Sequence, residues 1–299
     1  MSIVICKLPK AGLGNQLFPL LKAYTFADLN KLPIVVTGYN RFFIGPYLRR
    51  EKSKRKYNGT FIFQKNILAA GFEKWRLSKY KKHDQIIEPP IEQLGNKGDL
   101  NHAYIFYEMP HWDHYFDGLK EQRTLVIKLL WQVLLSPIRK KVLELPPPCI
   151  GIHIRMGDFR NLRDGETFGS AGAVRTPENY FINLVKSIRE IHGSDLPVSV
   201  FTDGSRRELD QLFQLSNITL IEGKSDMVDL LLLSKSKLII TSAGSTFSYW
   251  AAFLSDAIVI MHPTHVNTVI RPPQLCDTLY QGAFNTDNML LMNSIRNIT

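Results

Sequence analysis

The sequence predicts an α/β protein with two parallel-sheet halves that face each other across a cleft. Its 299 residues are enough to fill two halves of roughly 150 residues each. Residues 2–37 read as strand, glycine turn, helix and strand, which is the opening of a parallel α/β unit. The same alternation returns over residues 149–261. Between them, three prolines at 146–148 end any helix, so we predict domains at 1–146 and 147–299.

The N-terminal half is clear at its start and less clear in its middle. Residues 2–8 are an apolar run suited to a buried strand, and residues 15–30 carry apolar side chains near helical spacing. Residues 32–37 read as the next strand. Residues 40–115 are aromatic and basic without a clean period, and we expect short helices and loops there. Residues 119–145 read as helical again.

The C-terminal half alternates regularly between strands and helices. Strands are predicted at 149–154, 198–201, 218–221, 238–240 and 257–261, and helices at 177–192, 205–214, 225–234 and 245–254. Thr176 suits the N-cap of the first helix, with Pro177 at its first position, and Gly193 suits the C′ position after its end. For a last helix near the C-terminus, one alternative is that it packs back on the N-terminal half.

The composition fits a soluble globular protein, with 44% apolar and 21% charged residues. No run of about 18 uncharged apolar residues is present, so we expect no transmembrane helix. The first residues also lack the pattern of a signal peptide. Three scattered cysteines favour a reducing compartment and indicate neither a disulfide framework nor a cysteine metal site. We therefore expect a cytoplasmic protein.

Positive charge is concentrated in one basic patch, residues 41–82. The patch holds 13 Lys or Arg residues against two Glu, a local balance of +11 within a net charge of +10. A solvated face is the default interpretation. The functional alternative is peripheral contact with an anionic membrane, at its inner face, or with a pyrophosphate-bearing lipid acceptor. A nucleic-acid-binding protein is a distant alternative, because no recognisable binding module or interleaved aromatic residues accompany the basic run.

Three polar clusters follow predicted strands, at the edge where open α/β sheets bind ligands. The first is GLGNQ at residues 12–16. A short glycine loop lets a ligand approach the backbone, and Asn15 and Gln16 would point amides at it. The alternative is a tight turn with a capping Asn. Leu17 stands where a dinucleotide fingerprint has its third glycine, so that motif is not matched.

The second cluster is GIHIRMGD at residues 151–158. Strand alternation puts His153 and Arg155 on one face and the neighbouring isoleucines on the other. An arginine at a strand end inside a parallel sheet is costly unless it meets an anion, and its planar fork suits a pyrophosphate. An internal ion pair between Arg155 and Asp158 is an equally good interpretation.

The third cluster is SAGST at residues 242–246, between a buried strand and a helix. Hydroxyl groups and free backbone amides at a helix N-terminus form a ready anion site. The alternative is ordinary serine or threonine capping of that helix, which is frequent in proteins.

Together the three clusters resemble one family. Their motifs, in chain order, are Gly12-X-Gly14-Asn-Gln, His153-X-Arg155-X-Gly-Asp and a late Ser245-Thr-Phe-Ser-X-Trp block. The set resembles the bacterial and animal α-1,2-fucosyltransferases, and its first two motifs are similar to motifs of protein O-fucosyltransferases and α-1,6-fucosyltransferases. The resemblance implies a GT-B-like fold of two Rossmann-type halves, GDP-fucose as the donor, inversion at the sugar carbon, and no required metal or cofactor.

The resemblance also implies roles for individual residues. Arg155 would lie on the donor β-phosphate with His153 beside it, and Asp158 and Asn15 complete the candidate catalytic set. The candidate donor-binding residues are Gly12, Gly14, Gln16, Thr202, Asp203, Asp229, Ser242, Ser245, Thr246 and Phe247. Met156 departs from the family, because it replaces the second arginine of the usual His-X-Arg-Arg motif and so removes one cation.

The implied reaction builds negative charge on a leaving pyrophosphate, where preorganised cationic and N–H donors assist. Arg155 and the helix start at 245–246 would supply them without Mg²⁺, and no Asp-X-Asp triplet is present to hold a metal. We expect transfer of fucose to a hydroxyl, favouring the 2-OH of a galactoside, of an oligosaccharide or lipid-linked glycan bound by the N-terminal, acceptor-side half. A related transferase with another nucleotide sugar is the alternative. A carboxylate paired with Arg155 would be a weak base, so Asp158 is only a candidate for that role.

Residues 40–145 match no family pattern and hold two weaker signals. His111, Asp113 and His114 have a spacing that could suit a metal, but such short sets are seldom metal sites. Several aromatic residues in this region are more typical of a core than of a sugar-binding platform; they are Tyr104, Phe106, Tyr107, Trp112, Tyr115 and Phe116.

Overall fold

The computed structural model divides into two compact units, and the division falls within helix α5 (Ser136–Glu144), between Lys140 and Lys141. This point lies a few residues before the predicted boundary at 146–147. The structure describes residues 2–38, 48, 57, 60–61, 77–78, 80, 82–94, 101–166, 168, 173–266 and 269–299. Most of the basic patch at 41–82 therefore lies outside the described residues.

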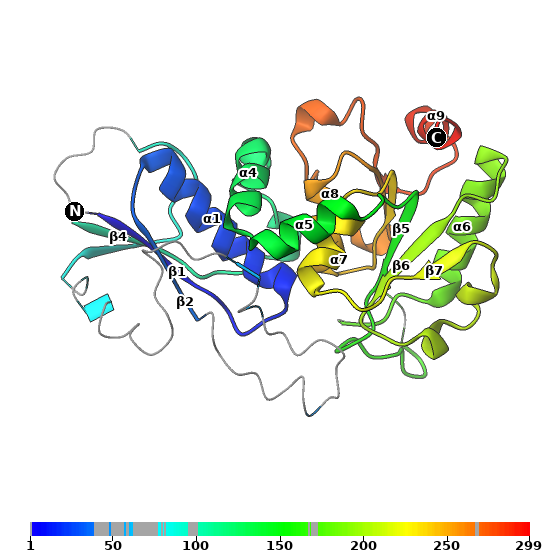
Figure 1. Cartoon of the computed structure of the whole chain (residues 1–299), viewed down its shortest axis with the longest axis horizontal. Helices are drawn as coiled ribbons and strands as arrows, with labels where there is room; N and C mark the ends of the chain where they lie inside the picture. Colours follow the sequence, from blue (N-terminus) through cyan, green and yellow to red (C-terminus); the bar gives the residue numbers. More distant parts are fainter. Residues whose placement is uncertain are drawn as a thin grey trace. The chain divides into compact units, whose positions relative to one another are not determined.

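The first unit contains a parallel four-stranded sheet in the order β2-β1-β4-β3 (Figure 1). Its strands are β1 (Ile3–Lys7), β2 (Ile34–Thr37), β3 (Asp84–Ile87) and β4 (His102–Phe106). Helix α1 (Leu13–Asn30) connects β1 to β2 and packs on the sheet, and α4 (Arg123–Val133) packs on α1. Aromatic rings fill this core, since Phe26 of α1 contacts both Tyr104 and Phe106 of β4.

Two strands lie where short helices and loops were expected, so this part of the prediction was wrong. The edge strand β3 gives little side-chain signal, because most of its residues are exposed and it is held by backbone pairing to β4. Short 3₁₀ turns do follow at η1 (Trp112–His114) and η2 (Lys120–Gln122). The helix predicted over 119–145 is divided into α4 and α5, because Leu134 is extended and forms a bridge with Phe61.

The second unit contains a parallel six-stranded sheet in the order β10-β9-β8-β5-β6-β7. Its strands are β5 (Ile150–Ile154), β6 (Val198–Thr202), β7 (Ile218–Leu220), β8 (Leu238–Ile240), β9 (Ile258–Met261) and β10 (Gln281–Ala283). Read from β7, this is the strand order of a doubly wound dinucleotide-binding sheet. The chain leaves β7 at one edge and returns on the other side of β5, so the topological switch point lies between β5 and β8.

Helices cover both faces of this sheet (Figure 1). The isoleucines of β5 belong to a core shared with α6 (Glu178–His192) and α9 (Met289–Arg296). A separate core lies under α7 (Asp226–Leu233) and α8 (Thr246–Leu254). Gly151 permits α7 to pack closely, because a Cβ there would lie 2.3 Å from the Ser236 hydroxyl. The last helix, α9, packs on α6 within this unit.

The helix termini in this unit agree only in part with those predicted from the sequence. Gly193 ends α6 with a φ of 81° and donates its N–H to Arg189, as predicted. Thr176 is not the N-cap of α6, because the cap position belongs to Pro177. The helix predicted over 205–214 consists instead of two 3₁₀ turns, η3 (Arg206–Leu209) and η4 (Leu212–Gln214).

Candidate functional site

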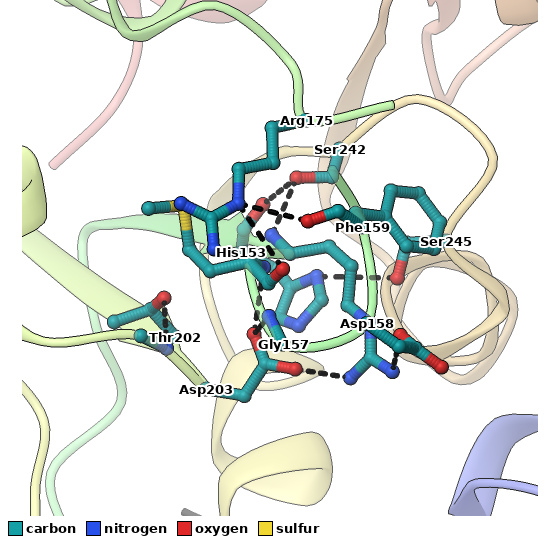
Figure 2. Close-up of polar contacts among 12 residues, drawn as sticks. His153, Gly157, Asp158, Phe159, Arg175, Thr202, Asp203, Ser242 and Ser245 are labelled. Atoms are coloured by element: carbon teal, nitrogen blue, oxygen red, sulfur yellow. Dashed lines mark hydrogen bonds and ion pairs between the residues drawn. The ribbon is translucent and has the colours of Figure 1, made fainter. Parts of the chain in front are cut away.

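The second and third sequence clusters lie side by side at the switch point, where β5 and β8 end (Figure 2). The link between them is Ser242, which follows β8 and is fully buried. Its hydroxyl donates to the His153 carbonyl at 2.8 Å and accepts the Arg155 N–H at 2.9 Å. Ser242, predicted as a donor-binding residue, therefore uses its hydroxyl to hold the end of β5.

Arg155 lies between two carboxylates. One terminal nitrogen of its guanidinium donates to Asp203 and the other to Asp158. The side chains of Arg155, Asp203 and Asp158 are 23%, 17% and 35% exposed, so Asp158 is the most accessible of the three. The internal pair that the sequence left open is present, and a second carboxylate joins it.

Asp203 also fixes the turn after β5. Its second oxygen accepts the N–H groups of Met156 at 2.7 Å and Gly157 at 3.1 Å. A Cβ at Gly157 would lie 2.4 Å from this carboxylate, so only glycine lets the turn approach it without a shift. The turn that carries Asp203 is itself closed by Thr202, whose hydroxyl accepts the Gly204 N–H at 3.0 Å.

His153 is buried on the opposite sheet face from the isoleucines of β5. Its ring stacks on Phe247 of α8 at 4.6 Å, and its Nδ1 lies 3.5 Å from the Ser245 hydroxyl. Burial lowers the pKa of His153 to about 3; the charge of Asp203 opposes this shift and that of Arg155 adds to it. The imidazole is therefore neutral at physiological pH.

The start of α8 does not use ordinary side-chain capping. Ser245 occupies the N-cap position, but its side chain makes no capping bond. The preceding loop amides are engaged, since Ala243 donates to Thr176 and Gly244 to the Tyr249 hydroxyl. The first amides of the helix, beginning at Thr246, have no acceptor within the helix and can bind an anion.

The first cluster, GLGNQ, forms the start of α1 in the other unit. Gly12 is its N-cap residue with a φ of −65°, and a Cβ there would meet nothing within 4 Å. The fold thus leaves open space in front of Gly12 and does not itself require glycine. Gly14 and Gln16 are buried, and the Gln16 amide donates to the Ala11 carbonyl. Asn15 lies in the first turn, so the alternative of a capping Asn is wrong.

Asp229, another predicted donor-binding residue, lies in the first turn of α7, the helix that leads from β7 to β8. It is half-buried and sits on a different element from the Arg155 cluster. Its part in nucleotide binding stays a prediction.

Sequence reasoning gave no role at the site to Arg175, Thr176 or Glu208. Arg175 donates to the carbonyls of Phe159 and Met156 and to the Glu208 carboxylate, so it joins the turns after β5 and β6. Met156 is buried in the core with its side chain beside Gly204. Arg175 is a second arginine that contacts this turn. The available signal was an arginine directly before the Thr176-Pro177 helix start.

The weaker signals have simpler explanations. His111 pairs with Asp113 and His114 with Asp117 on the surface, and no group of metal-binding side chains gathers among the described residues. In the aromatic set, Tyr104, Phe106 and Phe116 are buried core residues, whereas Tyr107 is exposed at the end of β4. Within the described part of the chain, no helix has the length and apolar character needed to cross a membrane.

Comparison with known proteins places these features in a family. The sequence model described as glycosyl transferase family 11 matches residues 99–270, more than half of the chain. The crystal structure of fucosyltransferase NodZ from Bradyrhizobium is similar, with 14% identity, a TM-score of 0.54, and coverage of 88% of this chain and 96% of that one. The crystal structure of NodZ alpha-1,6-fucosyltransferase soaked with GDP-fucose has 15% identity, a TM-score of 0.50, and coverage of 87% and 94%. No curated protein matches the sequence.

At these identities the similarity to NodZ shows the fold, and it confirms the predicted GT-B-like α/β class. The match to the family model begins just before β4, the last strand of the N-terminal sheet in chain order, and includes the Arg155 cluster. The chain therefore belongs to glycosyl transferase family 11 and is a glycosyltransferase.

Proposed function

We propose that this glycosyltransferase is an inverting fucosyltransferase that moves fucose from GDP-fucose to a hydroxyl of a glycan. The observation that carries the proposal is the place of Arg155, at the switch point of a doubly wound sheet and beside the start of α8. Such switch points bind nucleotides. The choice of donor is supported by the sequence motifs and by the NodZ structures, one of which was soaked with GDP-fucose.

Arg155 would stabilise the leaving GDP. Breaking the sugar–phosphate bond places negative charge on the β-phosphate, and a fixed guanidinium beside that oxygen lowers the barrier. Asp203 is held by two backbone N–H groups and keeps one terminal nitrogen of Arg155 in place. Asp158 is more exposed, so we expect a phosphate oxygen to replace it on the other nitrogen.

This exchange would release Asp158 next to the bond that breaks. A carboxylate that loses its pairing with arginine becomes a stronger base. Asp158 is therefore our candidate to accept the proton of the attacking acceptor hydroxyl, a contribution of typically 10²–10⁴-fold for general bases.

His153 is assigned a supporting role. Its burial and low pKa keep it neutral, so it is poorly suited to carry a proton during turnover. Its stacking on Phe247 instead holds the first turn of α8, where the amides of Thr246 and Phe247 would bind the donor phosphates. Asp203 and Asp229 on the nucleotide side, and Gly12, Gly14, Asn15 and Gln16 of the first unit, complete the proposed set.

We propose that the first unit binds the acceptor, an oligosaccharide or lipid-linked glycan. The favoured site of transfer is the 2-OH of a galactoside.

The protein would act in the cytoplasm, and its reaction would not require a metal. Its basic patch would contact an anionic membrane from the inner face. A transferase for a different nucleotide sugar is the main alternative.

Incubation with a panel of GDP- and UDP-sugars tests the donor. We expect sugar transfer and GDP release with GDP-fucose, turnover that survives EDTA, and a higher unfolding temperature with GDP, because a ligand that binds only the native state stabilises it. Equal stabilisation by UDP, or turnover only with another nucleotide sugar, would favour the alternative donor.

Loss of turnover in EDTA that Mg²⁺ or Mn²⁺ restores would show that a metal acts at the leaving group.

A further inference from the structure

The segment from Val174 to Thr176 joins three loops of the proposed donor site, although none of the sequence motifs includes it. It enters beside the loop after β5, where the Arg160 N–H donates to the Ala173 carbonyl at 3.0 Å and the Arg175 N–H donates back to the Arg160 carbonyl at 2.9 Å. At its other end the segment is followed by Pro177, the N-cap residue of α6. We call residues 174–176 the strap.

Arg175 closes the turn that carries Asp158. Its Nε donates to the Phe159 carbonyl at 2.9 Å and the Met156 carbonyl at 3.3 Å, which are the two ends of that turn (Figure 2). The same guanidinium donates to Glu208 at 3.0 Å. Glu208 is in turn held by the N–H and hydroxyl of Ser205, so Arg175 also fixes the turn after β6, which follows Asp203.

Thr176 joins the strap to the third loop. Its side chain is buried, and its hydroxyl accepts the Ala243 N–H at 3.0 Å. Ala243 lies between Ser242, which holds the end of β5, and Ser245, which begins α8. The buried Thr176 hydroxyl therefore ties the strap to the loop that leads from β8 to the start of α8.

We propose that Arg175 and Thr176 are positioning residues of the transfer reaction, which rests on the proposed donor site. Together they fix the relative positions of Asp158, Asp203 and the start of α8. Lysine cannot replace Arg175, because a single ammonium lacks the planar fork that reaches two carbonyls and a carboxylate together. Displacement of a positioned group by about 1 Å can reduce turnover roughly 10²-fold.

Arg189 provides a matched control for Arg175. It is a partly buried arginine in the same unit, and it too donates to backbone carbonyls, those of Leu196 and Ser216, and to a carboxylate, that of Asp195. Its partners lie at the amino ends of the strands, because Leu196 precedes β6 and Ser216 precedes β7, whereas the proposed site lies at the carboxyl ends. Arg189→Lys therefore removes a comparable set of bonds away from the switch point.

The experiment compares Arg175→Lys with Arg189→Lys, and Thr176→Val with Thr176→Ser. We expect Arg175→Lys to lower kcat roughly tenfold to hundredfold with little change in acceptor KM, whereas Arg189→Lys lowers the unfolding temperature and leaves kcat near wild type. Thr176→Val loses the acceptor of a buried N–H and should lower kcat similarly, while Thr176→Ser, which keeps the hydroxyl, should restore it. Equal losses of kcat in Arg175→Lys and Arg189→Lys, or a fully active Thr176→Val, would overturn the proposal.

Hydrogen exchange separates this proposal from the choice of donor. In Thr176→Val the Ala243 amide should exchange roughly tenfold faster or more, and in Arg175→Lys the Met156 and Gly157 amides should lose protection, while amides in the core of α6 stay unchanged. This pattern supports the strap even if GDP-fucose proves not to be the donor. Unchanged exchange at these amides, or a uniform loss of protection across the unit, would contradict it.

Discussion

One arginine lies at the amino ends of the strands in the six-stranded sheet and another at the carboxyl ends, and the two have different kinds of partner. Arg271, near the amino ends of β9 and β10, is 2% exposed and donates to the carbonyls of Ser255, Ala257 and Tyr280. Arg155, at the carboxyl end of β5, is partly exposed and paired with two carboxylates. Arg271 joins loops through backbone carbonyl groups, whereas Arg155 is held by two carboxylates, which we propose a ligand phosphate can partly replace.

The comparison shows that burial by itself does not indicate function. The more buried arginine has fixed backbone partners, as expected for a structural role. The less buried arginine lies at the switch point, beside the first amides of α8, which have no acceptor within the helix. Exposure, partner type and position in the topology together distinguish the two roles.

The largest expected effects come from removing each arginine. Arg155→Ala should lower kcat roughly 10²–10³-fold, the scale for loss of one preorganised donor, while the protein stays folded. Arg271→Met should instead lower the free energy of unfolding by about 3 kcal/mol or more, because three buried carbonyls lose their donor. Activity assays corrected for the folded fraction and thermal unfolding of both variants measure this difference. An Arg155→Ala protein that unfolds would make Arg155 a structural residue as well.

A substitution at Gly157 should have an intermediate effect. In Gly157→Ala the new methyl group meets the Asp203 carboxylate, so the turn must shift and loosen the hold of Asp203 on Arg155. We expect a loss of roughly tenfold or more in kcat with a small change in unfolding temperature. Gly193→Ala, at a positive φ and with open space around it, is the control: it should reduce stability alone. Similar kinetic losses in both variants would argue against a specific role for Gly157.

The next expected effect concerns His153 and pH. In the folded protein the pKa of this imidazole is about 3, so the ring stays neutral until the pH falls near that value. In the unfolded chain its pKa is the ordinary 6.5. The unfolded state therefore binds more protons in this window, and stability falls as the pH drops from about 6.5 towards 3. His153→Phe keeps an aromatic ring on Phe247 without a titrating group, so its stability should depend less on pH between these values. Urea unfolding at several pH values measures the free energy of unfolding of both proteins. If this free energy changes with pH equally in the wild type and in His153→Phe, the buried neutral state is contradicted.

Most of the second unit could be predicted from sequence because its signals are local. Buried parallel strands give continuous apolar runs such as residues 150–154, and alternation separated His153 from the isoleucines beside it. The edge strand β3 was missed because its side chains are largely exposed and carry no such pattern. The division of residues 119–145 into two helices depends on the bridge between Phe61 and Leu134, which are distant in the sequence.

The site was predictable as a set of residues and much less so as a network. The motifs brought Arg155 and Asp158 together correctly, since they are three residues apart. The second partner, Asp203, and the hydroxyl of Ser242 reach the turn from far along the chain. Arg175 acts on backbone carbonyls, which leave no pattern in the sequence, so its place directly before the Thr176-Pro177 helix start did not identify its partners.

Calorimetric titration with GDP and with UDP, on the wild type and on Arg155→Ala, tests most directly whether the switch point is a guanine-nucleotide site centred on this arginine. We predict that the wild type binds GDP without added metal and binds UDP much more weakly, and that Arg155→Ala loses most of the GDP affinity while it remains folded. Equal affinity for the two nucleotides, or GDP binding that Arg155→Ala leaves unchanged, would contradict the proposed site.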